Sequence, residues 1–89
     1  MLKITTVQER GNDVLLKLEG KITEQWAALL DGECRSFLRR KKLVCLDCSQ
    51  VEFIDQRGVD VVNNFPPAQV TLISVPGFVT ELLQIGGQS

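Results

Sequence analysis

The chain opens with two segments, 2–8 and 13–18, in which apolar residues recur at every second position, as at Leu2 and Ile4 and at Val14, Leu16 and Leu18. This period of two is typical of half-buried strands. Gly11 and Asn12 stand between the segments and tolerate the positive φ angles of a tight turn. We therefore expect an antiparallel hairpin, broken off at Gly20. The side chains expected to face the core are Val14, Leu16 and Leu18.

A helical period follows in residues 24–40, where apolar side chains recur at steps of three and four. Thr23 stands at the expected N-cap, and Glu24 is placed to favour the positive end of the helix. The predicted apolar stripe consists of Trp26, Leu29, Leu30, Cys34, Phe37 and Leu38. Six such side chains, at ~1.5–3 kcal/mol each, contribute on the order of 10 kcal/mol of gross transfer free energy. This helix should be the main cover of a sheet.

Residues 43–46, Leu-Val-Cys-Leu, form a short apolar run without alternation. Such a run favours a strand of a parallel sheet that is buried on both faces. Asp47 then marks the point where the chain leaves the core for a polar loop. Because ligand and partner sites favour the ends of such strands, we expect the working surface of the protein here.

The second half of the chain predicts a short helix, a strand and a last helix. The short helix is indicated by the spacing of Val59, Val61, Val62 and Phe65. It should end before the prolines at 66–67, since a residue that precedes proline avoids the helical region. Residues 70–75 are mostly β-branched and predict a strand, and 76–85 predict a helix. Its inward side chains should be Phe78, Val79, Leu82 and Leu83. The fold class is therefore α/β, with one domain over 1–85 and a flexible tail over 86–89.

Composition agrees with a single small globular domain. The chain has 89 residues, of which 44% are hydrophobic and 24% charged, and its net charge is −1. Near-neutral charge gives no reason to expect a nucleic-acid partner. Three cysteines, without an apolar secretory segment, indicate free thiols and a cytoplasmic protein. The longest uncharged stretch, 65–80, is interrupted by prolines, so we expect no insertion into a membrane.

Few residues are candidates for catalysis or metal binding. Cys45 and Cys48 have the spacing of a redox or zinc half-site, but side chains three apart on a strand point to opposite faces. We expect a buried, unreactive pair. Asp47 and Asp55 are candidates for paired carboxylates, although a loop contact and a helix cap explain them better. The chain has no histidine. We expect no catalytic residue, no metal and no cofactor, and therefore no enzyme.

Residues 39–42, Arg-Arg-Lys-Lys, are a run of four cations. At the C-terminal end of the long helix they complement the negative end of its dipole. A solvated structural role is one interpretation of this run. Docking of an acidic partner or of an anionic membrane face is the other.

Residues 46–58, LDCSQVEFIDQRG, resemble the signature of STAS domains, the anti-sigma-factor-antagonist family. That signature is roughly D-x-S-x-V-x-F-I-D-S-x-G. The positions that match in register are Asp47, Ser49, Val51, Phe53, Ile54, Asp55 and Gly58. Upstream, residues 16–22 resemble the entry of the family into its first helix. The resemblance implies a compact domain with a mixed sheet, in which an N-terminal hairpin is followed by βα units. STAS domains usually have a longer second helix than this chain predicts.

The resemblance also implies a non-catalytic module that binds another protein. The expected partner-binding residues are Asp47, Ser49, Asp55, Gln56, Arg57 and Gly58. In the family, switch kinases phosphorylate a serine directly after the aspartate, and here that position is Gln56. We therefore expect binding that is not switched there, with Arg57 adding a positive charge that favours an acidic partner. The alternative is that Gln56 and Arg57 are ordinary solvated residues.

Two partner classes follow from the resemblance. One is an anti-sigma factor or a related ATP-binding switch kinase. The other is the ATPase of an ABC transporter that carries a small STAS subunit. Some STAS domains are also reported to bind nucleotides or small ligands, which leaves a ligand-binding domain as a further alternative.

Overall fold

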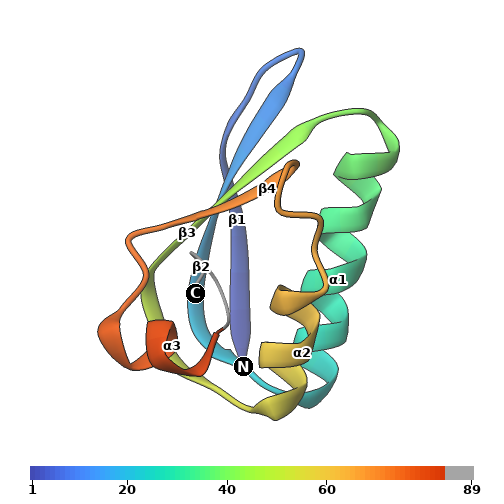
Figure 1. The fold of residues 1–89 in the computed structure, drawn as a ribbon. Coiled ribbons are helices and arrows are strands. Elements are labelled where there is room, and N and C mark those ends of the chain that lie inside the picture. Colours follow the sequence, from blue (N-terminus) through green and yellow to red (C-terminus); the bar gives the residue numbers. More distant parts are fainter. Residues whose placement is uncertain (84–89) are drawn as a thin grey trace.

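The computed structural model describes residues 1–83, which fold into a four-stranded sheet and three helices (Figure 1). The elements are β1 (Leu2–Glu9), β2 (Asp13–Ile22), α1 (Glu24–Arg39), β3 (Leu43–Ile54), α2 (Gln56–Asn63), β4 (Val70–Ile73) and α3 (Gly77–Leu82). The strand order is β1-β2-β3-β4, with β1 antiparallel to β2 and the other neighbours parallel. The predicted α/β class is confirmed, including the N-terminal hairpin, the βα units and the short second helix. The expected end of the last helix and the tail at 86–89 lie outside the described residues.

The hairpin forms as predicted, but the backbone conformation of its residues differs from the prediction. Neither Gly11 nor Asn12 has a positive φ. Gly20 does, with φ 110°, and it does not end the strand, because β2 continues to Ile22. A Cβ on Gly20 would collide with the carbonyl oxygen of Met1, so this position accepts the close approach of β1 only without a side chain.

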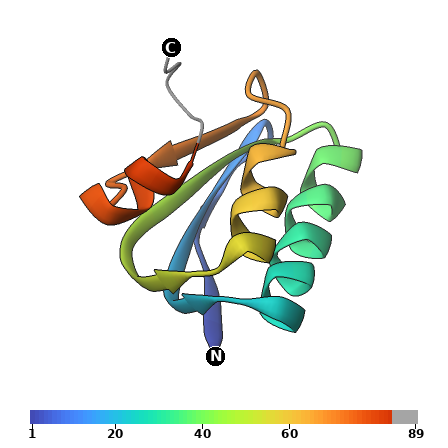
Figure 2. The same ribbon diagram turned by 60° about the horizontal axis from the view of Figure 1, so that its bottom comes forward.

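One face of the sheet carries the core. The strand residues buried on it are Val14, Leu16 and Leu18 of β2 and Val44, Leu46 and Cys48 of β3. From α1 the buried residues are Ala27, Leu30, Cys34 and Phe37, and from α2 they are Gly58, Val59 and Val62. Helices α1 and α2 lie side by side against this face in both views (Figures 1 and 2). The predicted orientation of β2 is confirmed.

The opposite face of the sheet is covered only in part, which contradicts the prediction that residues 43–46 are buried on both faces. Leu43 is 52% exposed and Cys45 is half-buried, whereas Val44 and Leu46 between them are buried. The reason is topological. Parallel crossovers are nearly always right-handed, and the two crossovers through α1 and α2 advance in the same direction along the sheet. They therefore place both helices on the same side.

Strand β3 is longer than predicted. The polar loop expected after Asp47 is the second half of the strand, which runs to Ile54. Its pairing with β2 is interrupted by two register shifts, between Lys17 and Glu19 and between Gly20 and Lys21. Such shifts bend a strand, and β3 curves in Figures 1 and 2. The strand end that leads into α2 is therefore beside Asp55, eight residues after Asp47.

The faces of two helices differ from the prediction. In α1 the buried stripe includes Ala27, while Leu29 is 44% exposed. In α3 only Val79 points into the core, and Phe78 and Leu82 are exposed. A helix of six residues presents only one narrow face to the core. It therefore cannot bury all the apolar residues that were expected to point inward. No helix in residues 1–83 is both long and apolar enough to cross a membrane.

Candidate functional site

Asp55 stands at the junction between β3 and α2. It is the N-cap residue of α2, and its Oδ1 accepts a hydrogen bond of 2.8 Å from the N–H of Gly58. An aspartate at this position satisfies a backbone donor that the helix itself leaves unpaired. The predicted cap is confirmed.

The second carboxylate oxygen of Asp55 holds the start of α1. The N–H of Glu24 donates to Oδ2 of Asp55 over 3.1 Å. Thr23 occupies the N-cap position of α1 as predicted, but its side chain makes no capping bond. One carboxylate therefore fixes the N-termini of two helices at the same corner of the molecule, where the negative charge also complements both helix dipoles.

Gly58 is buried where the first turn of α2 meets the ends of β2 and β3. A Cβ on it would collide with the carbonyl oxygen of Ile22 and would lie 2.7 Å from Cγ1 of Ile54. The glycine thus allows the first turn of α2 to approach the end of β2. Its contact with a partner stays a prediction, and the structure adds a role for Gly58 in spacing the elements that carry its neighbours.

Gln56 and Arg57 form the exposed first turn of α2. Nε2 of Gln56 donates to Oδ1 of Asp60 over 2.9 Å, so the amide lies along its own helix. Within residues 1–83 the guanidinium of Arg57 makes no hydrogen bond or ion pair. Its charge is therefore open to solvent and available to an external carboxylate.

Asp47 and Ser49 lie apart from this corner, in the middle of β3. Oδ1 of Asp47 accepts from the N–H of Ser49 over 2.9 Å, and this bond lowers the pKa of Asp47. The contact is the local one predicted for Asp47. The predicted set of site residues is thus divided: residues 55–58 lie together at the start of α2, whereas Asp47 and Ser49 shape the strand.

The sequence pattern missed one exposed apolar side chain at the end of β3, shortly before α2. Phe53, two residues before Asp55, is 50% exposed. The sequence holds only a weak signal, because Phe53 and Ile54 are consecutive apolar residues of a strand and only one of them can face the core; the structure buries Ile54. Exposed aromatic side chains and arginines are both enriched in protein-binding surfaces, and Phe53 and Arg57 are four positions apart in the chain.

The cysteines do not form a reactive pair. Cys48 is buried and Cys45 is half-buried, so their side chains lie on opposite faces of the sheet and the expected buried pair is wrong for Cys45. Burial raises the pKa of Cys34 and of Cys48 to about 12, and it also raises the pKa of Cys45. Thiols with raised pKa values are poor nucleophiles. Residues 1–83 contain no cluster of three or more side chains able to hold a metal ion.

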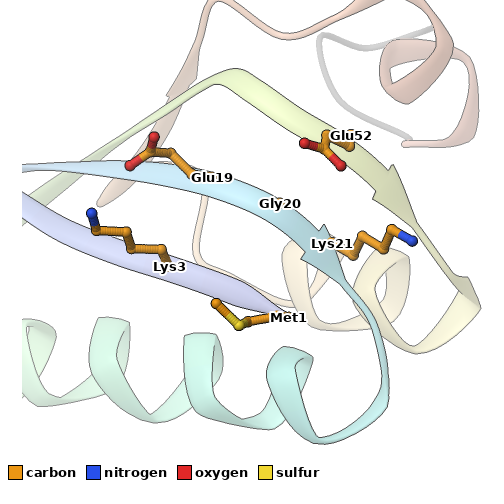
Figure 3. A pocket seen from close by; sticks show the side chains of 6 residues that line it. All are labelled: Met1, Lys3, Glu19, Gly20, Lys21 and Glu52. Carbon is orange, nitrogen blue, oxygen red and sulfur yellow. The ribbon is translucent and has the colours of Figure 1, made fainter.

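A hollow of about 490 Å³ is open to solvent near the start of β1. It is lined by Met1, Lys3, Glu19, Gly20, Lys21 and Glu52. Figure 3 shows that the four charged side chains are spread over three strands and do not converge on one point. A small-ligand site normally combines an enclosed apolar wall with a few convergent polar groups. This hollow has neither.

Comparison with known families agrees with this arrangement. A family model described as "Mlab, STAS domain" matches residues 5–88, so the chain belongs to the STAS family. Among solved structures, the fold is similar to the unphosphorylated form of the anti-sigma factor antagonist SpoIIAA. The TM-score is 0.74 at 13% sequence identity, over 94% of this chain and 84% of that chain. No curated protein matches the sequence.

Proposed function

We propose that this STAS domain is a non-catalytic cytoplasmic module that binds an ATP-binding protein through the exposed start of α2. The contact residues are Gln56 and Arg57, supported by Phe53 and positioned by Asp55. The partner is an anti-sigma factor or a related switch protein.

The observation that supports this proposal is the double cap by Asp55. Its two oxygens hold the starts of α1 and α2, with bonds to the N–H groups of Glu24 and Gly58. The exposed turn between them is therefore rigid before a partner arrives. Preorganised contact residues lose less conformational entropy on binding, so even a small surface can bind specifically.

Gln56 favours a second candidate partner, the ATPase of an ABC transporter that carries a small STAS subunit. An amide at position 56 has no hydroxyl to phosphorylate, and it is already bonded to Asp60. An anti-sigma-factor antagonist is released by phosphorylation in the switch that the family uses, whereas a subunit of a permanent assembly needs no release. The absence of this hydroxyl therefore fits the transporter partner at least as well as the regulatory one.

The test is a pull-down from lysate of the source cells, with the tagged domain as bait and mass spectrometry of what it retains. The variants are Gln56→Asp and Arg57→Glu, which add negative charge to the first turn of α2. We expect wild type to retain an ATP-binding protein and each variant to lose at least tenfold of it, since a negative charge set against an acidic partner surface costs several kcal/mol. The identity of that protein distinguishes the regulatory partner from the transporter ATPase.

Matched controls place the same charge changes elsewhere. Gln69→Asp repeats the change at Gln56, and Lys3→Glu repeats the change at Arg57, both at exposed positions away from α2. Both controls should retain the partner. Equal retention by all variants would remove the α2 start from consideration, and saturable nucleotide binding by the purified domain alone would favour the ligand-binding alternative instead.

A further inference from the structure

The turn between β1 and β2 and the end of α1 lie at the end of the molecule opposite the start of α2 (Figure 1), and both segments carry cations. We call this end of the molecule the basic end. Arg10 comes from the turn between β1 and β2, and residues 39–42 come from the end of α1 and the connection to β3. With Glu9 and Asp13, which lie on the same hairpin, these five cations give the basic end a net charge of +3. The whole chain has a net charge of −1, so the remainder carries −4.

Two of the cations tie the segments together. Nη2 of Arg40 and Nζ of Lys42 lie 2.8 and 3.0 Å from Oε2 of Glu9, and Nζ of Lys42 also donates to the carbonyl oxygen of Arg10 over 2.6 Å. These contacts lower the pKa of Glu9, with the hydrogen bond from Lys42 as the main cause. The basic end is thus one assembled surface rather than two loose segments.

Arg39 and Lys41 are the unpaired members of this surface. Both are exposed, and within residues 1–83 neither side chain makes a hydrogen bond or ion pair. Arg40 and Lys42 already flank the C-terminal end of α1 and complement its dipole. Arg39 and Lys41 are therefore not required there. Their charges are available to an external anion.

The backbone at Lys41 allows a specific test of this cation. The N–H of Lys42 donates to the carbonyl of Phe37, and the N–H of Lys41 donates to that of Leu38. This pair of bonds is a Schellman motif, whose C′ position normally holds glycine because the chain there is left-handed. Here the C′ residue is Lys41, with φ 65°. A lysine thus occupies a position where glycine would fit with less strain, and this makes Lys41→Gly a substitution that removes the charge without harm to the fold.

An apolar side chain accompanies the cations. Leu43 is 52% exposed, directly after Lys42, and its N–H donates to the carbonyl oxygen of Asn12 over 2.8 Å. That bond places Leu43 beside the turn that carries Arg10. Exposed apolar groups among cations match the boundary between lipid headgroups and acyl chains. A nucleic-acid backbone, which is hydrated and presents no apolar group, would gain nothing from the leucine, whereas an acyl chain buries it.

We propose that the basic end is a peripheral docking surface for membranes rich in anionic phospholipid. The contact is with headgroups and inserts no segment across the bilayer. Each cation near an anionic surface raises the affinity for the membrane by about fivefold. Arg39 and Lys41, which have no ion-pair partner in residues 1–83, together raise it about 25-fold. Binding weakens as salt rises, because the headgroup charges are screened.

The test is cosedimentation of the purified chain with vesicles of equal parts phosphatidylglycerol and phosphatidylcholine, beside vesicles of phosphatidylcholine alone. Wild type should sediment with the anionic vesicles at low salt and stay in solution with the neutral ones. Arg39→Gln/Lys41→Gln should bind about 25-fold more weakly. The matched control Lys3→Gln/Lys21→Gln removes two exposed cations from the opposite half of the molecule and should bind as wild type does.

Lys41→Gly separates the docking role from a structural one. Glycine relieves the left-handed strain, so the variant should unfold at a Tm several degrees higher while it binds anionic vesicles about fivefold more weakly. The proposal is overturned if wild type ignores anionic vesicles, if it binds neutral ones equally, or if both double variants lose the same affinity. Capture by immobilised polyglutamate without capture by vesicles would assign the surface to an acidic protein and would also overturn the lipid proposal.

Discussion

Asp55 holds two helix starts with one carboxylate, so its removal should loosen both. We predict that Asp55→Ala lowers the free energy of unfolding by about 1–2 kcal/mol, the upper part of the range for a lost N-cap. Asp55→Asn should cost less, because the amide oxygen still accepts from Gly58. Urea denaturation measures both. Glu81→Ala, at an exposed carboxylate of α3, should stay within about 0.5 kcal/mol of wild type, and an equal loss there would contradict the double cap.

Two glycines with opposite surroundings test the packing of the α2 start. Gly58→Ala forces a methyl group against the carbonyl of Ile22 and should lower the unfolding free energy by about 1–3 kcal/mol. Gly32→Ala, within α1, meets nothing within 4 Å and should raise it by about 0.5–1 kcal/mol. Denaturation curves with opposite shifts support the close approach of α2 to β2. A neutral Gly58→Ala would show that the corner is loosely packed.

Gln56 should make the domain insensitive to phosphorylation at the family position. Incubation with ATP and a cognate switch kinase should leave the mass of wild type unchanged, since an amide accepts no phosphoryl group. Gln56→Ser restores the hydroxyl and should gain one phosphate, which adds about −1.5 to −2 charges at the first turn of α2. Mass spectrometry reads both outcomes. A phosphate added to wild type, for example on Ser49, would refute an unswitched module.

At this scale, two local carboxylate contacts were predicted correctly, although the expected cap by Thr23 lacks its side-chain bond. The bonds from Gly58 to Asp55 and from Ser49 to Asp47 join residues three and two positions apart, and both were expected. The bond from Glu24 to Asp55 spans 31 positions and was not. Local spacing carries no information on which helix start will meet which carboxylate.

Among the elements, β3 tests whether the two faces of the sheet are covered unequally. Leu46→Ala removes a fully buried side chain and should lower the unfolding free energy by about 2–5 kcal/mol. Leu43→Ala, three residues earlier on the partly covered face, should change it by less than about 0.5 kcal/mol. The two variants delete the same atoms, so urea denaturation isolates the effect of burial. Equal losses would restore the expectation of a strand covered on both faces.

The elements themselves follow from periodicity, and most of their boundaries were predicted within two residues. The sequence did not predict which face of the sheet the helices cover. Residues 43–46 are apolar throughout, and the sequence does not reveal that both crossovers place their helices on one side. The same limit applies to α3. Its four apolar residues fit an inward stripe, yet only the packing shows that Val79 and Leu83 are buried and that Phe78 and Leu82 are not.

For the whole molecule, the fold places the basic end and the start of α2 at opposite ends of the sheet. Residues 39–42 are visible as a basic run in the sequence, but Arg10 joins them only because the hairpin turn reaches the end of α1 through Glu9 and Lys42. The start of α2, with its exposed Arg57, lies at the other end of the sheet (Figure 1). A domain held by a partner at α2 therefore still presents its basic end outward.

Because the two proposed surfaces are far apart, we predict that a substitution in one of them abolishes its own binding and leaves the binding at the other intact. Arg57→Glu and Arg39→Gln/Lys41→Gln both change the net charge from −1 to −3, so a general effect of charge would be equal in the two variants. We expect Arg57→Glu to lose the protein retained in the pull-down and to bind anionic vesicles within about twofold of wild type, since one distant charge is screened over roughly 10 Å. Arg39→Gln/Lys41→Gln should retain the protein in the pull-down and bind anionic vesicles about 25-fold more weakly. Circular dichroism confirms that both are folded, and loss of both activities in either variant would mean that the two ends do not act as separate surfaces.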